Sequence, residues 1–404
     1  MGIKKSFCFL INSLAGGGAE RVLIRILSFL KPKKVFLLER EINYPVDESL
    51  VEILSKHSIR TNPILKTLYI PLYALRLSSK LENSSTVVSF LERANFVNVL
   101  SKSFKKHKAI ISVRMDQESG HKGLRKLNSL LIKIFYPRAD LVIAVSKGVK
   151  ESLIRLGVPE EKIKVIYNPY PIEEIQGLTK EPLYEYEVIF KNPVLITAGR
   201  LTKQKGQWHL LRIFKKLKEE FPELKLVILG EGELKEYLFK LSQTLGLKTF
   251  VWDRDKLSED FDVYFLGFQK NPFKFIGRAE LFVFPSLWEG FPNALVEAMA
   301  CGVPVVSSDC RSGPREILAP DRDFRIETQE PEFAEYGVLM PVFEVKFKKA
   351  DEPLEEKEIM WAETLRRLLI DDKLRAHYSQ RALERAEDFR IEKIIEEWRW
   401  VLES

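Results

Sequence analysis

Cysteine is scarce in this chain of 404 residues, and its three copies form no disulfide framework or metal motif. Cys8, Cys301 and Cys310 are an odd number, and no two of them form a C-x-x-C pair. Each lies in or beside an expected strand, so we expect reduced structural thiols of a cytoplasmic protein. An acidic cluster at metal-ligand spacing is also missing. We therefore expect no cofactor and no required metal ion.

Long apolar runs are absent as well. No segment approaches the ~18 consecutive apolar residues that span a bilayer. The short apolar run after Lys4 and Lys5 leads into a glycine loop with no cleavage site. That loop lacks the dinucleotide fingerprint G-x-G-x-x-G. What is present is a soluble, globular composition, 45% hydrophobic and 30% charged, with enough length for two domains with full cores.

Acidic residues are under-represented in the first part of the chain. Residues 1–170 carry 29 Lys and Arg against 14 Asp and Glu, whereas the remainder carries 35 against 43. A basic part joined to a mildly acidic one indicates an anionic partner on the N-terminal side. The alternative, a generic solubility charge, does not explain the segregation.

Strand, loop and helix patterns alternate along the chain, as in doubly wound α/β domains. Residues 4–11 predict a strand that leads through Gly17 and Gly18 into an amphipathic helix with Glu20 near its start. Glycines at such a turn let the backbone approach a ligand closely. By itself this loop is a weak signal.

Two later strands end beside arginines. Arg93 follows the strand expected at 86–91, and Arg114 follows the one expected at 109–113. Because doubly wound sheets bind ligands at the carboxyl ends of their strands, both arginines are site candidates. The sequence leaves two roles open for Arg114, a ligand contact or an ion pair at a domain interface.

A basic amphipathic segment is expected at residues 121–138. Its apolar residues recur at helical spacing between basic ones, and a lysine run at 102–108 and an apolar patch at 69–73 precede it. This pattern predicts docking on an anionic membrane surface. The alternative is that the apolar stripe packs on the sheet. We expect peripheral attachment to the inner face of the plasma membrane and no nucleic-acid partner.

Prolines at 169 and 171 and a polar stretch after them predict an interdomain linker over 171–192, between domains at 1–170 and from 193 onward. The second domain opens with a strand and the loop Gly199-Arg200, followed by Lys205. Arg200 offers planar bidentate donors and Lys205 a point charge, which together suit a diphosphate. Solvated charge is the alternative. The acidic stretch 249–262 is expected to be a surface insertion.

The chain is most informative at residues 284–318, FPSLWEGFPNALVEAMACGVPVVSSDCRSGPREIL. A strand at 281–284, a helix at 293–300 and a strand at 303–307 are expected, with Gly302 ending the helix. Glu289 precedes the helix and Glu297 lies eight positions later, inside it. Two carboxylates at this spacing could hold two hydroxyl-rich parts of one ligand beside the helix N-terminus. Alternatively, they are a loop charge and a solvated helix residue.

This stretch resembles the Glu–seven residues–Glu motif of retaining glycosyltransferases of family 4 with the GT-B fold, of the bacterial surface-glycan type. The Gly-Arg…Lys element of the preceding loop also matches. The resemblance covers most of residues 5–400 and is specific over 199–318. It implies an α/β architecture of two Rossmann-like, doubly wound domains facing across a cleft. The nucleotide-sugar domain would span 193–385, and a C-terminal helix at about 386–404 would cross back to the N-terminal acceptor domain.

The resemblance implies transfer, with retention, of a hexose or N-acetylhexosamine from a UDP-linked sugar to a hydroxyl of a lipid-linked saccharide, in surface polysaccharide synthesis. Arg200, Lys205 and Glu289 would be catalytic. The donor would be bound by Gly17, Gly199, Arg200, Lys205, Glu231, Phe268, Glu289, Gly290, Phe291 and Glu297. The acceptor or donor-sugar side would hold Gly18, Glu20, Arg93 and Arg114.

The sequence departs from the family pattern at one position, and two other functional classes stay open. Many members carry a histidine that contacts the donor sugar near the place that Arg114 occupies here. A GT-B epimerase or phosphorylase would share the architecture, although we find no pyridoxal-lysine context. A non-catalytic module that binds a sugar nucleotide or lipid is the third class, and the intact basic and acidic motif residues argue against it.

Overall fold

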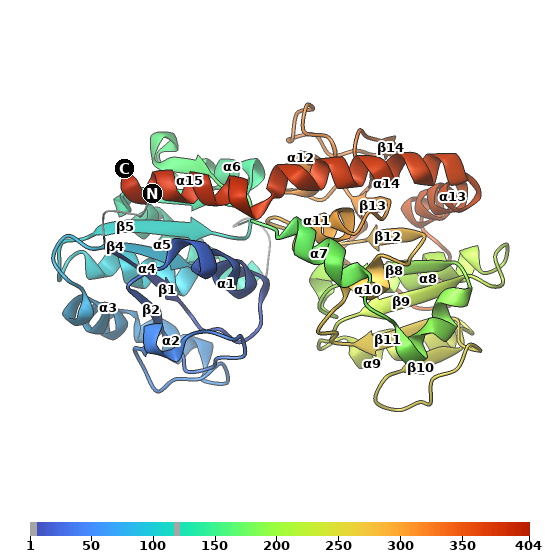
Figure 1. The fold of residues 1–404 in the computed structure, drawn as a ribbon, viewed down its shortest axis with the longest axis horizontal. Helices are drawn as coiled ribbons and strands as arrows, with labels where there is room; N and C mark the ends of the chain where they lie inside the picture. Colours follow the sequence, from blue (N-terminus) through green and yellow to red (C-terminus); the bar gives the residue numbers. More distant parts are fainter. Residues whose placement is uncertain (1–5, 117–121) are drawn as a thin grey trace. The chain divides into compact units, whose positions relative to one another are not determined.

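The computed structural model describes residues 6–116 and 122–404, without the side chains of 122–127. The chain forms two compact units (Figure 1). Unit 1 comprises the residues up to Tyr170 together with Arg390–Ser404, and unit 2 comprises Pro171–Phe389. Each unit has its own parallel sheet and its own hydrophobic core.

The sheet of unit 1 has seven parallel strands in the order β3-β2-β1-β4-β5-β6-β7. The strands are β1 (Phe7–Ile11), β2 (Lys34–Leu37), β3 (Val51–Ile53), β4 (Thr86–Phe90), β5 (Lys108–Val113), β6 (Leu141–Ala144) and β7 (Ile163–Val165). The helices are α1 (Gly18–Leu30), α2 (Pro63–Leu68), α3 (Ile70–Lys80), α4 (Glu92–Ser101), α5 (Lys122–Phe135), α6 (Lys147–Arg155) and α15 (Ile391–Glu403). The chain adds β2 and β3 on one side of β1 and the later strands on its other side, so the sheet is doubly wound, as expected from the sequence.

The last helix, α15, completes the core of unit 1. Trp398 is fully buried there and stacks on Phe90 of β4, with ring centroids 5.8 Å apart. The return of the C-terminal helix to the first domain is therefore confirmed. Trp400, on the opposite side of α15, is exposed beneath the Lys164 ammonium. The C-terminal helix, expected to begin at about residue 386, begins at Ile391, because a short 3₁₀ turn at Glu387–Phe389 separates α15 from the helix before it.

The sheet of unit 2 has eight strands in the order β10-β11-β9-β8-β12-β13-β15-β14, parallel except for the edge strand β14. The strands are β8 (Val194–Ala198), β9 (Lys225–Leu229), β10 (Thr249–Val251), β11 (Val263–Gly267), β12 (Leu281–Phe284), β13 (Val305–Ser308), β14 (Glu332–Phe333) and β15 (Val338–Met340). The helices are α7 (Ile172–Thr179), α8 (Gln207–Leu217), α9 (Lys235–Thr244), α10 (Phe273–Ile276), α11 (Asn293–Ala300), α12 (Pro314–Leu318), α13 (Glu356–Ile370) and α14 (Asp372–Ala386).

The segment 171–192, expected to be a polar linker, belongs to unit 2 instead. It forms α7 and a 3₁₀ helix at Tyr184–Lys191. A few apolar side chains among its many polar residues anchor it, and Ile172, Ile175 and Ile189 are buried. Similarly, the stretch 249–262 is not entirely a surface insertion. It opens with the buried edge strand β10, and only the acidic residues after that strand lie in a loop.

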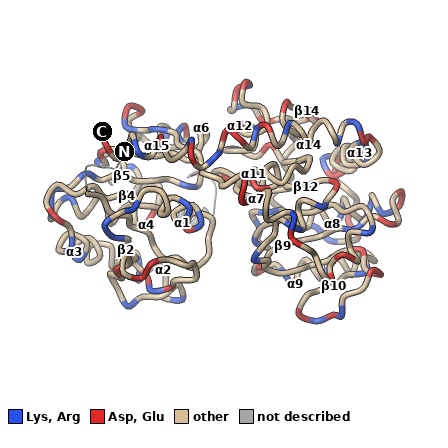
Figure 2. The backbone as a smooth tube through the Cα atoms, viewed as in Figure 1, with Lys and Arg blue, Asp and Glu red and all other residues tan. Residues whose placement is uncertain are grey.

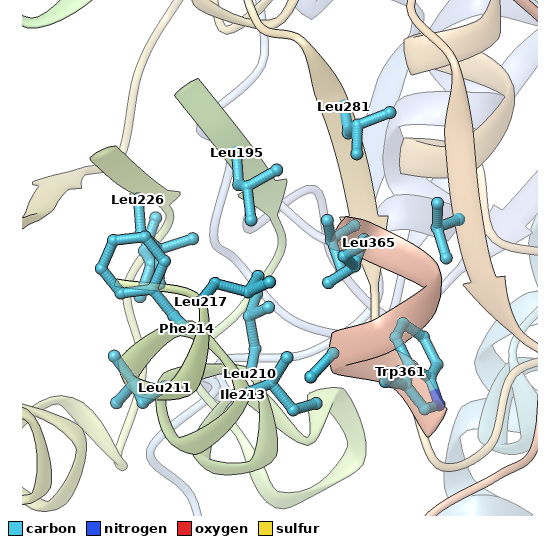
Figure 3. Close-up of a cluster of buried hydrophobic side chains, with 14 of the residues drawn as sticks. Leu195, Leu210, Leu211, Ile213, Phe214, Leu217, Leu226, Leu281, Trp361 and Leu365 are labelled. Carbon is cyan, nitrogen blue, oxygen red and sulfur yellow. The ribbon is translucent and has the colours of Figure 1, made fainter. Parts of the chain in front are cut away.

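Helix α8 is held in place by apolar packing on one side (Figure 3). Its buried face contributes Leu210, Ile213, Phe214 and Leu217, which meet strand residues such as Leu195 and helix α13 in one cluster. Because α8 follows directly on the basic loop after β8, this packing fixes where that loop ends.

A buried ion cluster also joins α8 to α13. The Glu358 carboxylate lies 2.7 Å from Nδ1 of His209 and 3.0 Å from Nε of Arg212, and all three side chains are buried. His209 Nε2 faces the Glu344 carbonyl at 3.2 Å. Both ring nitrogens of His209 therefore lie within hydrogen-bond distance of acceptor oxygens. Every member of the cluster is paired, as a structural network requires.

Candidate active site

The sheet order of unit 2 brings four strand ends together. Strand β8 lies between β9 and β12, so the chain reverses its direction of travel across the sheet at β8. Ligands of doubly wound sheets bind at such a switch point, outside the carboxyl ends of the strands. The sequence-predicted residues of the second domain follow β8, β9, β11 and β12, and they meet at this edge.

The centre of the site is an ion pair between Lys205 and Glu289. The Lys205 ammonium donates to Oε1 of Glu289 at 2.5 Å, and Glu289 is only 6% exposed. The stem of Lys205 passes over Gly199, where a Cβ would lie 3.3 Å from Cε of Lys205. The ammonium also lies 4.9 Å from the ring centroid of Phe284. The structure thus joins two of the three expected catalytic residues.

Main-chain contacts hold the two loops that carry this pair. The Leu287 N–H donates to the Gln204 carbonyl at 2.8 Å, and the Gln204 side chain donates to the Trp288 carbonyl at 2.8 Å. Gly206, at a φ of +62°, packs so tightly that a Cβ there would lie 2.4 Å from the Pro285 carbonyl oxygen. A glycine is needed for both reasons. The pair is therefore held by fixed backbone.

The loops after β8, β9 and β11 are joined in the same way. The Leu201 N–H donates to the Glu231 carbonyl at 2.9 Å, and the Gly230 N–H donates to the Gly267 carbonyl at 2.8 Å. The Phe268 N–H reaches Oε1 of Glu231 at 3.2 Å. Phe268 itself is 67% exposed at the end of β11. An exposed aromatic ring beside this carboxylate is a platform on which a flat ring can stack.

Arg200 lies one residue beyond Gly199 and is exposed. Its carbonyl accepts a hydrogen bond from the Gln207 side chain at 3.1 Å, which ties the loop to α8. Its guanidinium makes no ion pair with any part of the chain that the structure describes. A positive, bidentate donor thus stands on the same loop as the Lys205–Glu289 pair.

Helix α11 begins and ends where the sequence predicts. Gly290 and Phe291 are buried in the loop before it, and the Phe291 ring packs edge-on against Phe389 at 5.4 Å. Glu297 is the fifth residue of the helix and is buried. Together with burial, its charge raises the pKa of the Cys301 thiol four residues later. The alternative of a solvated Glu297 is excluded by its burial.

Four buried polar atoms near these loops have no hydrogen-bond partner among the described residues, and sequence reasoning did not single them out. They are Oγ1 of Thr202, Oε1 of Gln207 and the Oγ atoms of Ser286 and Ser312. Buried polar groups in proteins are nearly always paired, so such a group needs an explanation. These residue types are common in loops, and nothing in the sequence distinguishes them.

In unit 1, the expected residues of the glycine loop gather at the start of α1. Gly17 precedes the helix and Gly18 opens it. The Glu20 carboxylate folds back over Gly17, where a Cβ would lie 2.3 Å from Oε2. Only glycine leaves room for that carboxylate at the positive end of the helix dipole.

Arg93 takes part in a largely buried ion cluster inside unit 1. It pairs with the Glu39 carboxylate, which the Lys66 ammonium also contacts at 3.1 Å. Lys66 and Glu39 are both buried. This cluster gives Arg93 a structural partner, and its expected ligand contact stays a prediction.

Arg114 is arranged differently. Both terminal guanidinium nitrogens are buried and have no hydrogen-bond partner among the described residues. The guanidinium carbon lies 5.1 Å from the ring centroid of Phe90. Burial lowers the pKa of Arg114 from 12.5 to about 10, and only the nearby Tyr170 acts against this. Within the described residues of unit 1, no carboxylate forms an ion pair with Arg114, and its ligand contact and its ion pair at a domain interface both stay predictions.

Two searches of the described residues have negative results. In residues 6–116 and 122–404, no group of three or more His, Cys, Asp and Glu side chains is placed to hold a metal ion. Among the helices described, none is long and apolar enough to cross a bilayer. The expected basic helix of residues 121–138 corresponds to α5, but residue 121 and the side chains of 122–127 lie outside what the structure describes.

Solved structures resemble this fold over nearly its whole length. HepE of Anabaena, solved in complex with UDP, has a TM-score of 0.72 at 20% identity, covering 98% of this chain and 99% of that one. A glycosyltransferase from Rickettsia africae has a TM-score of 0.68 at 15% identity, covering 99% and 98%. These likenesses confirm the expected GT-B fold.

Comparison of sequences identifies the family. Residues 16–174 match the family model described as Glycosyltransferase Family 4, and residues 186–332 match that described as Glycosyl transferases group 1. An uncharacterized glycosyltransferase of Methanocaldococcus jannaschii is 42% identical over 76% of this chain and 75% of its own length. The N-acetylgalactosamine-N,N'-diacetylbacillosaminyl-diphospho-undecaprenol 4-alpha-N-acetylgalactosaminyltransferase of Campylobacter jejuni is 32% identical over 95% of each chain. The chain therefore belongs to the family 4 and group 1 glycosyltransferases.

Proposed function

We propose that this glycosyltransferase moves a hexose or N-acetylhexosamine, with retention, from a UDP-linked sugar to a hydroxyl of a lipid-linked saccharide in surface-glycan synthesis. The observation that carries the proposal is the ion pair of Lys205 with the buried Glu289 beside Arg200, at the switch point of the second sheet. Two comparisons support the substrates. The Campylobacter relative is named for a diphospho-undecaprenol-linked sugar, and HepE was solved with UDP and with UDP-glucose.

Different residues of unit 2 bind different parts of the nucleotide-sugar donor. Arg200 and Lys205 bind the diphosphate and stabilise the negative charge that builds on it as it departs. Glu289 accepts hydrogen bonds from sugar hydroxyls beside the Gly290 and Phe291 backbone amides. Glu297 holds the ribose hydroxyls. The base stacks at Phe268, whose ring is exposed beside Glu231.

Transfer takes place on the front face of the sugar. The bond from the anomeric carbon to the diphosphate oxygen breaks, and the acceptor hydroxyl oxygen forms the new bond on the same side. The hydroxyl proton passes to an oxygen of the departing diphosphate, so no separate base is needed. The reaction requires no metal ion because Arg200 and Lys205 supply the positive charge. In unit 1, Gly17 binds the donor, and the residues that bind the acceptor or the donor sugar are Gly18, Glu20, Arg93 and Arg114.

The same proposal places the enzyme in the cytoplasm, at the inner face of the plasma membrane. Its acceptor is held there by the lipid, and the excess of Lys and Arg in residues 1–170 favours an anionic surface. Basic positions occur throughout unit 1 (Figure 2).

The first experiment is a hydrolysis and binding screen of UDP-, GDP- and ADP-sugars with the purified protein. Release of UDP from one sugar fixes the donor, whereas binding without turnover on any acceptor favours a binding module. No binding of any sugar nucleotide overturns the proposal.

Glu289→Gln tests the site in the same assay. Turnover should fall at least ~100-fold, since the sugar loses its carboxylate contact. The affinity for UDP should rise, by about fivefold for 1 kcal/mol, because Glu289 no longer competes with the diphosphate for the Lys205 ammonium. Glu330→Gln, an exposed glutamate of unit 2, is the control and should change neither value. Near-wild-type turnover of Glu289→Gln would contradict the site.

A further inference from the structure

An exposed apolar surface covers α2 and α3 in unit 1. Six large apolar side chains are between 36% and 71% exposed within 17 residues, and we call them the α2–α3 face: Ile59, Ile64, Leu65, Leu68, Leu72 and Leu75. No other stretch of 17 described residues exposes as many. Single exposed apolar residues are ordinary, but a concentration of them marks an interaction surface.

The fold does not need these side chains for its own core. The inner side of α3 is already apolar, with Ile70, Tyr73 and Leu77 buried. Leu72 and Leu75 lie on its other side and remain exposed. A helix that is apolar on both sides has a second surface to bury.

The segment is also firmly built, so the apolar side chains are held outward. The Asn62 side chain caps α2 by accepting from the Ile64 N–H at 2.9 Å, and Pro63 occupies the first turn. Beneath α3, His57 packs edge-on against Tyr69 with ring centroids 4.7 Å apart. Arg76 donates to the Leu54 carbonyl at 2.8 Å.

The charged residues within this segment are of one sign. Residues 53–81 contain no Asp or Glu, whereas they contain five Lys and Arg. Of these, Lys66 is buried in the Glu39 cluster, and Lys56, Arg60, Arg76 and Lys80 are exposed. Lys80 is paired with Glu52 from the neighbouring strand, at 2.9 Å. An apolar surface on a segment whose own charges are all basic is complementary to an anionic lipid bilayer, in which acyl chains lie beneath negative headgroups.

We propose that the α2–α3 face inserts into the headgroup region of an anionic bilayer and holds the enzyme there. This inference rests on the proposed function for its purpose, which is access to a lipid-linked acceptor. It also moves the centre of the membrane contact from the basic helix at 121–138 to the region of the apolar patch at 69–73, which the sequence also indicated. In the part of α5 whose side chains are described, Leu130 and Ile134 are exposed and Ile132 is buried, so this part exposes fewer large apolar side chains than the α2–α3 face does.

Vesicle co-sedimentation with the full-length protein tests the proposal. Wild type should bind vesicles that contain phosphatidylglycerol and bind pure phosphatidylcholine vesicles much less. Leu68→Ser/Leu72→Ser/Leu75→Ser should lower the partition onto the anionic vesicles at least ~10-fold. Lys56→Glu/Arg60→Glu should weaken binding to the anionic vesicles only. The matched control is Ile326→Ser/Ile359→Ser/Ile370→Ser, which alters three exposed apolar residues of unit 2 and should bind as wild type does.

The outcomes separate this inference from the proposed reaction, because vesicle binding requires no turnover. Donor hydrolysis in solution by the leucine variant should equal that of wild type, which shows that the fold and donor site are intact. Vesicle binding by the leucine variant at the wild-type level would overturn the proposal. So would a wild-type dimer in sedimentation equilibrium that the leucine variant converts to a monomer, since a second copy would then cover the face.

Discussion

Replacing Arg114 by methionine should stabilise the protein and reduce its activity at the same time. The terminal guanidinium nitrogens of Arg114 are buried and have no hydrogen-bond partner among the described residues, and burial lowers its pKa from 12.5 to about 10. A change of that size corresponds to roughly 3 kcal/mol for keeping the charge in place. The cation–π contact with Phe90, whose ring centroid lies 5.1 Å from the guanidinium carbon, offsets about 0.5–2 kcal/mol of this cost. Methionine, of similar length and uncharged, should therefore raise the free energy of unfolding by about 1–3 kcal/mol.

The assay pairs urea unfolding with turnover. The unfolding midpoint of Arg114→Met should rise at an unchanged slope, which reports a gain in stability and no change in the surface exposed. Turnover should fall, by about 100-fold if the guanidinium forms a charge-assisted bond to the substrate. Arg114→Lys keeps the charge but loses the planar pair of donors, so it should show no gain in stability and a smaller loss of turnover.

Loss of stability in Arg114→Met would refute this reasoning. It would mean that the charge of Arg114 is compensated within the fold, as in the ion-pair role that the sequence left open. Removal of one member of a buried ion pair costs about 3–5 kcal/mol. The two roles therefore predict opposite signs, and the unfolding experiment separates them without any knowledge of the substrates.

Three further results are expected. Burial raises the pKa of Glu358, but hydrogen bonds from His209 and Arg212 outweigh this effect, so the pKa of Glu358 in the folded protein lies below the ordinary 4.5. The ionised Glu358 therefore stabilises the fold above pH 4.5. This stabilisation is lost as the pH falls through the pKa of the folded state. Glu358→Gln should cost about 3–5 kcal/mol in urea unfolding at neutral pH and flatten the acid limb of the stability profile, and a variant with the wild-type limb would contradict this. Burial raises the pKa of all three cysteine thiols, so iodoacetamide near neutral pH should label them only after urea is added, as mass spectrometry can show. Gly230→Ala should abolish UDP binding in calorimetry, because a Cβ there would lie 2.1 Å from the Gly199 carbonyl oxygen at a φ of +128°; wild-type affinity would show that the loop can shift.

The fold and the central part of the site could be predicted because their signals are local. The expected strand at 281–284 and helix at 293–300 match β12 and α11 residue for residue. A short apolar run and Gly302 determine those bounds, and both can be read from the sequence. In the structure the run is buried and Gly302 has a positive φ. Lys205 and Glu289, 84 positions apart, were both expected at the donor site, and they lie together because parallel strands bring their carboxyl ends to one edge.

What could not be predicted depends on tertiary contacts. The segment 171–192 has the composition of a linker, yet buried Ile172, Ile175 and Ile189 attach it to unit 2. No proline or glycine marks the break between α14 and α15 in the sequence. Exposure of the α2–α3 face is likewise invisible in a sequence whose apolar residues there recur as in any buried helix.

The same comparison separates structural from functional polar groups. In the Glu358 cluster every charge has a partner, and deletion of any member leaves another unpaired, so this cluster serves stability. At Arg114 and at Ser286 the buried polar atoms have no partner in the described chain. A fold that keeps such groups loses stability by doing so, and stability alone gives no reason to keep them. They lie after the carboxyl ends of β5 and β12, where a doubly wound sheet binds its ligands, so substrate contacts are the explanation that also fits their position. The stability gain expected for Arg114→Met is the direct measure of that reasoning.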